Sequence, residues 1–192
     1  MIITVLVVGY VGYKTVIFVP QDKKAVKLRF GKVVYKHGRP LIFEPGVHII
    51  VPFTHSVEQV DSRERVIRLK TDTHSTFFVP YKCDKPGGMR VAASVTVIPV
   101  DIHAWRYRSE DVENRVTDIC ITELQGPITS ADPFVILYNS TSFSTELYSQ
   151  SCLQINEKLS LYGASLVATN VGMSDVSDGQ PLADAVERLR PR

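Results

Sequence analysis

The sequence predicts an α+β fold, in which a β-rich half is followed by helices and one returning strand. Up to residue 100, apolar and polar residues alternate over several segments, which is the pattern of half-buried strands. Beyond residue 100, apolar residues recur at steps of three and four, which is the period of an amphipathic helix. Strands that come before the helices, rather than between them, indicate the α+β class.

The strands of the first half are predicted to be antiparallel and come from three alternating segments: residues 25–36, 66–70 and 89–100. In the first segment Val26, Leu28 and Phe30 share one side, and Gly31 breaks the strand. A turn is expected at residues 81–88, which contain one proline and two glycines. The last segment should bury one alternating face: Val91, Ala93, Val95 and Val97.

The second half is predicted to contain two long helices. Ser109 should cap the first helix, and Gly126-Pro127 should break it. The buried residues of the first helix are expected at Val112, Val116, Ile119 and Leu124. The second helix should cover residues 143–162 and end at Gly163. Its apolar residues are Tyr148, Cys152, Ile155, Leu159 and Tyr162.

Three shorter elements complete the predicted order. Residues 131–138 indicate a short helix or a buried segment between the two long helices. Residues 164–176 indicate the returning strand, and a last helix is expected to begin close to Pro181.

The N-terminal residues 1–14 are predicted to be an apolar membrane anchor, because the first 13 of them carry no charge. A helix of that length rises about 20 Å, which is short of the roughly 30 Å hydrocarbon core. It could therefore be a short tilted span, a monotopic insertion or part of a longer segment; a signal remnant and a buried element are the alternatives. The anchor residues are Ile2, Ile3, Val5, Leu6, Val7, Val8, Tyr10 and Val11.

Charge is spread unevenly along the chain. The net charge of +2 predicts no nucleic-acid partner. Between Lys14 and Arg39, however, eight basic residues accompany a single acid, Asp22. This run is either a solvated strand face or a contact for anionic lipid, to which each cation near the surface adds about 1 kcal/mol. The lipid candidates are Lys14, Lys23, Lys24, Lys27 and Arg29.

The side chains that usually carry chemistry show no recognisable arrangement. The three cysteines lack metal-ligand spacing, and the five histidines are scattered. No nucleophile elbow, phosphate-binding loop or zinc-protease motif occurs in the sequence. The charge clusters at residues 61–65 and 109–113 are expected to be solvated faces or salt bridges between subunits. We therefore expect no enzymatic activity, no cofactor and no metal.

Several short motifs, taken in order, resemble the opening of an SPFH (band 7, prohibitin homology) domain, whose members include stomatin, prohibitin, flotillin and the erlins. They are an RFGK strand, a Pro-Gly-x-His turn with Pro-Phe following, and an Asp-x-Arg strand. The residues are Arg29, Gly31, Pro45, Gly46, His48, Pro52, Phe53, Asp61 and Arg63. The resemblance implies an SPFH domain over residues 15–178, with residues 179–192 starting a C-terminal helix.

The stretch EPGVHIIVPF gives these motifs a physical role. Pro45-Gly46 is expected to be a tight reversal that delivers the next residues to a sheet. Pro52 lacks an amide donor, so it should end strand pairing or lie on an edge. His48 is expected to be a hydrogen-bonded histidine of the sheet or core, and Phe53 should pack on the core or against lipid.

The resemblance implies a non-enzymatic membrane scaffold that oligomerises and organises lipid or membrane proteins. Its expected partners are membrane lipid and other subunits, in a homo- or hetero-oligomer. Weak single anchors would suffice there, because linked anchors bind by avidity. No sustained heptads follow the domain, so an accessory subunit of a larger assembly is the alternative: a respiratory, ATP synthase or protease-regulating prohibitin-like complex.

A third hypothesis is a soluble enzyme or ligand-binding domain with a processed N-terminus. For the scaffold, the expected location is the mitochondrial inner membrane, with the endoplasmic reticulum or a bacterial membrane as alternatives.

Overall fold

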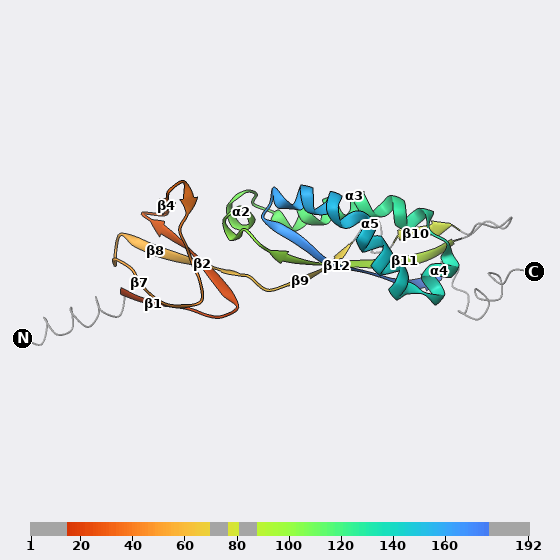
Figure 1. The fold of residues 1–192 in the computed structure, drawn as a ribbon, viewed down its shortest axis with the longest axis horizontal. Helices are drawn as coiled ribbons and strands as arrows, with labels where there is room; N and C mark the ends of the chain where they lie inside the picture. Colours follow the sequence, from red (N-terminus) through yellow and green to blue (C-terminus); the bar gives the residue numbers. More distant parts are fainter. Residues whose placement is uncertain (1–14, 70–76, 81–87, 177–192) are drawn as a thin grey trace, which may run out of the picture.

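The computed structural model describes residues 15–69, 77–80 and 88–176. These residues form an elongated molecule in which two lobes follow one another along the long axis (Figure 1). We call residues 15–61 the N lobe and the described residues 65–176 the C lobe. Strands precede helices and one strand returns, which confirms the predicted α+β class. The anchor at residues 1–14 and the helix expected near Pro181 lie outside the described residues.

The N lobe is built from eight short antiparallel strands. They are β1 (Val16–Val19), β2 (Lys23–Arg29), β3 (Lys32–Val33), β4 (Tyr35–Lys36), β5 (Arg39–Pro40), β6 (Ile42–Phe43), β7 (Gly46–Ile49) and β8 (His55–Asp61). Strand β2 pairs with β3, β6 and β8, while β1 pairs with β7 and β4 pairs with β5. The lobe is therefore three small sheets rather than one continuous module.

The turn after β2 differs from its prediction in one residue. Gly31 follows the strand with φ 77°, as a strand-breaking glycine should. Phe30 also takes a left-handed backbone, with φ 50°. This turn removes Phe30 from the face that it was expected to share with Val26, and its side chain is 71% exposed.

The C lobe is one four-stranded antiparallel sheet with helices on one face (Figure 1). Its strands are β9 (Arg65–Leu69), β10 (Phe77–Pro80), β11 (Gly88–Pro99) and β12 (Ala164–Val176). The central strand β11 pairs with β12 on one side and with β9 and β10 on the other. Its predicted buried face is confirmed at all four residues: Val91, Ala93, Val95 and Val97.

The helices are α2 (Ile102–Tyr107), α3 (Val112–Ser130), α4 (Pro133–Tyr138) and α5 (Ser140–Ser160). Helices α3 and α5 lie over the sheet, and the short α2 lies where the lobes meet (Figure 1). The sequence prediction missed α2, although Asp101 marks its start by accepting hydrogen bonds from the backbone N–H groups of His103 and Ala104. None of the helices in the described part of the chain is long and apolar enough to cross a bilayer.

Helix α3 corrects two predictions. Its N-cap is Asp111 rather than Ser109, and the predicted break at Gly126-Pro127 does not occur. An interior proline costs a helix about 3 kcal/mol. Here the fully buried Leu124 and Ile128 flank the proline and fix the helix to the core, which offsets that cost.

Helix α5 is rotated from its predicted orientation. The buried residues are Ser144, Leu147, Ser151, Ile155 and Leu159. Tyr148, Cys152 and Tyr162 pack only at the margin of the core. Gly163 follows the helix with φ 72°, as a C-terminal glycine does.

Candidate functional site

An apolar surface lies at the free end of the N lobe, where β1 and β7 pair. In their antiparallel register Val16 lies opposite Ile49, and Phe18 lies opposite Val47. All four side chains are exposed, Ile49 to 75%. Cross-strand neighbours share one face of a sheet, so these two pairs form a continuous apolar patch.

Two phenylalanines extend this patch at the ends of neighbouring turns. Phe30 and Phe53 are 71% and 76% exposed, and both take positive φ angles, 50° and 66°. The backbone N–H of Phe30 donates to the carbonyl oxygen of Thr54 at 3.0 Å, which holds the two turns together. Aromatic residues rarely adopt left-handed backbone, so the turns present these rings to the outside at a conformational cost.

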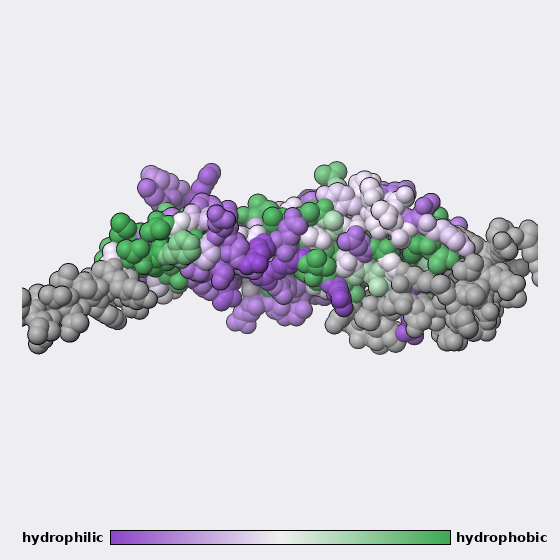
Figure 2. All heavy atoms as spheres, turned by 90° about the horizontal axis from the view of Figure 1, so that it is seen from below, coloured by the Kyte–Doolittle hydropathy of each residue, from purple (hydrophilic) through white to green (hydrophobic). Residues whose placement is uncertain are grey.

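We call this region the apolar end. It consists of Val16, Phe18, Phe30, Val47, Ile49, Val51 and Phe53. Figure 2 shows hydrophobic side chains gathered on this end of the N lobe, whereas hydrophilic ones cover the middle of the molecule. The described chain starts at the same place, because the Thr15 carbonyl accepts the N–H of Ile50 at 2.8 Å. Thr15, the first described residue, therefore lies beside the apolar end.

The structure separates the basic residues that were predicted to contact anionic lipid. Arg29 lies at the apolar end, with its guanidinium 5.9 Å from the centre of the Phe30 ring. Lys23 lies at the opposite end of the seven-residue strand β2, about 20 Å away. Between them Lys24 pairs with Glu44 at 3.1 Å, and Lys27 lies over the Phe43 ring. Lys14 lies outside the described residues.

The Pro-Gly-x-His motif forms the entry to β7. Gly46 has φ 140°, a backbone conformation that favours glycine. His48 Nε2 lies 2.6 Å from the carbonyl oxygen of Glu44, and the imidazole stacks on Phe43 with 4.5 Å between ring centres. His48 therefore stabilises the turn that precedes β7. Pro45 and Pro52 lie on either side of the strand.

The Asp-x-Arg motif forms the corner between the lobes. The Arg63 guanidinium makes ion pairs with Asp22, in the turn before β2, and with Asp61 at 3.7 Å. The backbone N–H of Arg63 also donates to Asp61 Oδ1 at 3.0 Å. These contacts fix the chain as it leaves β8.

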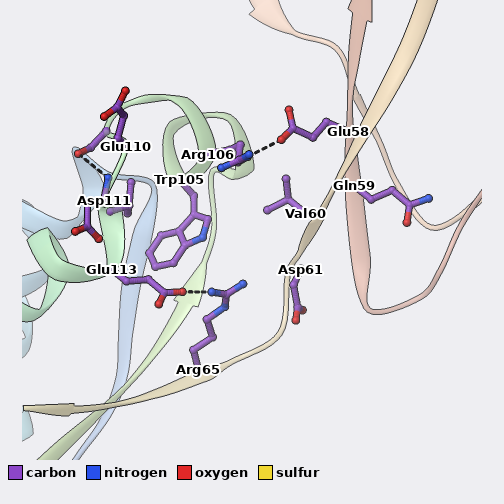
Figure 3. A pocket seen from close by; sticks show the side chains of 12 residues that line it. Glu58, Gln59, Val60, Asp61, Arg65, Trp105, Arg106, Glu110, Asp111 and Glu113 are labelled. Carbon is purple, nitrogen blue, oxygen red and sulfur yellow. Dashed lines mark hydrogen bonds and ion pairs between the residues drawn. The ribbon is translucent and has the colours of Figure 1, made fainter.

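A polar hollow of about 380 Å³ lies where the lobes meet (Figure 3). On one side Arg106 of α2 pairs with Glu58 of β8 at 2.6 Å, and on the other Arg65 pairs with Glu113. The buried Trp105 lies between the two pairs, with the Arg65 guanidinium 5.7 Å from its ring centre. The Arg65–Glu113 pair joins the two charge clusters within one chain.

Glu58 is the electrostatic centre of this junction, since Tyr107 also donates its hydroxyl to the same carboxylate. That hydrogen bond, together with Arg106, lowers the pKa of Glu58 although partial burial opposes the shift. Burial and the Glu58 carboxylate raise the pKa of Tyr107 to about 12. The sequence does not reveal the contact between Glu58 and Tyr107, because the two residues are separated by 49 positions and meet only through the tertiary fold.

The charged groups of the junction form ion pairs and hydrogen bonds with one another. Within the described ranges, no three His, Cys, Asp or Glu side chains are placed to hold a metal ion. Burial raises the pKa of the Cys120 thiol to about 12, so this thiol is not a ready nucleophile. The apolar end, in contrast to the junction, exposes several large hydrophobic side chains.

Comparison with known sequences identifies the family. The sequence pattern described as SPFH domain / Band 7 family matches residues 17–190. The chain belongs to the SPFH/Band 7 family. The match begins in β1 and therefore includes both lobes of the described SPFH domain, and it confirms the resemblance based on the short motifs.

Bacterial SPFH relatives also match over a shorter stretch. Proteins named "Modulator of FtsH protease HflC" from Escherichia coli K12, Escherichia coli O157:H7 and Shigella flexneri are each 33% identical over 73 residues. That stretch is 38% of this chain and 22% of each relative. The chain thus spans about a fifth of the length of the curated relatives that it matches.

Proposed function

We propose that this SPFH chain is a non-enzymatic, membrane-contacting part of an oligomeric scaffold. The observation that carries the proposal is the apolar end, where seven large hydrophobic side chains gather beside the start of the described chain. Soluble monomers rarely expose large contiguous apolar patches, and such patches often mark protein or membrane contacts. The uncharged segment at residues 1–13 precedes this end in the sequence, which supports a membrane contact.

The chemistry of the apolar end supports contact with a lipid surface. Phe30 and Phe53 extend from turns rather than from flat strands, so they can enter a headgroup region without burying unpaired strand edges. Arg29 lies beside Phe30 and would meet anionic headgroups, adding about 1 kcal/mol near such a surface. Each copy would bind weakly, and several linked copies would bind by avidity.

Sedimentation with vesicles tests this proposal. The paired variant Phe30→Ser with Phe53→Ser should lower the fraction bound to vesicles of phosphatidylcholine and phosphatidylglycerol in equal parts. We expect a loss of roughly tenfold or more, since burying one aromatic side chain is worth about 1.5–3 kcal/mol. The comparison is made both in the full chain and in a chain starting at Thr15, so that residues 1–14 do not mask the effect.

Leu153→Ser is the matched control. Leu153 is 80% exposed on α5 in the C lobe, so the control removes an equally exposed side chain from the other lobe. It should leave vesicle binding unchanged. Equal losses in both variants, or no loss in the paired phenylalanine variant, would count against the proposal.

A second candidate function comes from the relatives. Their name describes a modulator of the FtsH protease, so an SPFH subunit that modulates a membrane protease is the alternative form of the proposal. The rate at which FtsH degrades an unfolded substrate, with and without this chain in the same vesicles, tests it. An unchanged rate at saturating chain would exclude it.

The relatives also bear on location. They are bacterial proteins, so a bacterial membrane is the location that we propose among those predicted. The mitochondrial inner membrane gains no support from these relatives.

A further inference from the structure

Two tight turns of the N lobe are built alike. Phe30-Gly31 connects β2 to β3, and His37-Gly38 connects β4 to β5. In each turn a residue with an aromatic ring and the glycine after it take positive φ angles: 50° and 77° in the first turn, 53° and 78° in the second. Two consecutive positive φ angles are typical of the type I′ turn of two-residue hairpins. The two turns therefore hold their flanking residues in the same geometry.

Basic residues flank both turns. Arg29 lies opposite Lys32 across the first turn. Lys36 lies opposite Arg39 across the second. Residues opposite each other share one face, with Cβ atoms about 5 Å apart, and like charges in such a pair destabilise the hairpin. All four residues are exposed, and within the described ranges none of them forms an ion pair with an acid.

Two other basic residues of β2 show a different arrangement. Lys23 lies opposite Asp61 in the pairing of β2 with β8. Lys24 pairs with Glu44 at 3.1 Å. These two lysines have acidic neighbours, whereas no acid of the described residues pairs with the cations at the turns. The repulsion between the cations at each turn is therefore left for an anion from outside the described residues to relieve.

Both cation pairs point to the same side of the N lobe. Residues 32–36 run as one extended stretch from β3 into β4, in which alternate residues point the same way. Lys32 and Lys36 therefore share a side and lie about 13 Å apart. Tyr35 points to the opposite side, where its hydroxyl lies 3.1 Å from Nε2 of His103 in α2. Both cation pairs consequently face away from α2.

The spacing of each pair suits a phosphate group with two negative charges. Both cationic heads can donate hydrogen bonds to one phosphate, and the anion offsets the repulsion between them. A phosphomonoester carries between one and a half and two negative charges at neutral pH. The first turn belongs to the apolar end through Phe30, which places its cation pair at the proposed membrane contact. A lipid headgroup is therefore the source of phosphate that this position favours.

We propose that each of the two turns binds the phosphomonoester headgroup of an anionic lipid. The N lobe then has two phosphate contacts on one side, about 13 Å apart. This inference rests on the proposed membrane contact and adds to it a preference for one class of headgroup. It also gives the like-charge pairs a role, because the anion that they bind restores the balance of charge at each turn.

Binding to two kinds of vesicle with equal surface charge tests the proposal. One kind contains phosphatidylcholine with phosphatidic acid, a phosphomonoester; the other contains phosphatidylcholine with phosphatidylglycerol, a phosphodiester. The full chain should prefer the first kind. Arg29→Gln with Lys32→Gln, and Lys36→Gln with Arg39→Gln, should each lower this preference by about fivefold. All four changes together should abolish it.

Three controls accompany these variants. Arg68→Gln with Arg90→Gln removes the same charge from the C-lobe sheet and should leave the preference unchanged. Arg39→Glu places opposite charges across the second turn, so the hairpin should become more stable while the preference falls, which separates lost binding from lost folding. Inorganic phosphate, at the concentration of the accessible lipid phosphate, distinguishes the sources: if it displaces the chain from phosphatidic acid, the turns bind free phosphate and the lipid assignment is wrong.

The remaining outcomes separate this proposal from the membrane contact itself. If neither turn variant lowers the preference while the paired phenylalanine variant still loses vesicle binding, the phosphate contacts are wrong and the membrane contact stands. If only one turn variant lowers it, the assignment of the other turn is wrong. Equal losses on both kinds of vesicle would show that the turns supply general charge and bind no phosphomonoester. A chain that binds neither kind of vesicle contradicts both proposals.

Discussion

The two lobes differ in how the outer edge of a β-sheet is covered. In the C lobe the outer edge of β12 is closed by α5: Ser144 Oγ accepts the N–H of Val171 at 3.0 Å, and Asn156 Oδ1 accepts that of Leu166 at 2.7 Å. In the N lobe, no side chain of the described residues caps the outer edge of β7 in this way. The edge of β12 is thus covered by side chains of its own lobe, whereas the described residues leave the edge of β7 uncovered.

The distribution of apolar residues follows the same contrast. The N lobe buries five hydrophobic residues: Val19, Ala25, Val26, Ile50 and Val60. It exposes eight large ones: Val16, Phe18, Phe30, Tyr35, Val47, Ile49, Val51 and Phe53. The main core lies under α3 and α5 in the C lobe. The described C lobe therefore holds most of the buried hydrophobic core, while the N lobe exposes more large hydrophobic residues than it buries.

The largest expected effect is on the C lobe, from Gly163→Ala. A Cβ there would lie 2.2 Å from the Asp101 carbonyl oxygen and 2.9 Å from the Ala104 Cβ, on a backbone with φ 72°. Left-handed strain and overpacking together should lower the free energy of unfolding by about 3 kcal/mol. Urea denaturation measures it. Gly126→Ala is the control: with open space around a helical glycine, it should gain about 0.5–1 kcal/mol.

Removing the side chain that caps the edge of β12 should have the next largest effect on stability. It should also leave both lobes with an uncovered strand edge. Asn156→Ala leaves the Leu166 N–H without its acceptor, and an unsatisfied buried donor costs about 2 kcal/mol. The opened edge should also increase self-association of the C lobe, as exposed edges do. Asn156→Asp keeps the acceptor and is the control. Equal stability and equal light scattering for the two variants would show that the cap does not close the edge.

The junction between the lobes should give a smaller and pH-dependent effect. Since the pKa of Glu58 is lowered in the folded protein, its contribution is present above the ordinary value of 4.5 and disappears as the pH falls through the folded value. Glu58→Gln should cost about 1 kcal/mol at neutral pH, because the group is partly exposed, and nothing in acid. Glu44→Gln, which removes the exposed Lys24 pair, should change stability by less than about 0.5 kcal/mol. A Glu58→Gln loss that persists in acid would contradict this assignment.

The two lobes also differ in how far the sequence predicted them. The buried face of β11 was predicted correctly, because a central strand with helices on one face alternates cleanly. The rotation of α5 was not, because two buried residues are serines. Ser144 donates its hydroxyl to Ser140 and accepts from Val171, so it is buried with its hydrogen bonds satisfied. An apolar pattern cannot show such contacts.

The candidate site shows the same limit. The sequence identified the Pro-Gly-x-His motif but not the apolar end, because Val47 and Ile49 alternate as half-buried strand residues would. Which face is covered depends on the neighbouring strands, not on the segment itself. Glu58 is separated in the sequence by 48 positions from Arg106 and by 49 positions from Tyr107. No local pattern can therefore reveal these contacts.

The smallest expected effect has the opposite sign and falls on the N lobe. Phe53→Asn places a residue that tolerates φ 66° where an exposed aromatic now stands. We expect the free energy of unfolding to rise by about 0.5 kcal/mol while vesicle binding weakens. Val51→Asn is the control, because Val51 is exposed at the same end without a positive φ; it should weaken binding with no gain in stability. If both variants weaken binding and only Phe53→Asn gains stability, the N lobe holds this ring outward for contact rather than for folding. A loss of stability at Phe53 would place the ring among the groups that hold the lobe together and would remove that contrast between the lobes.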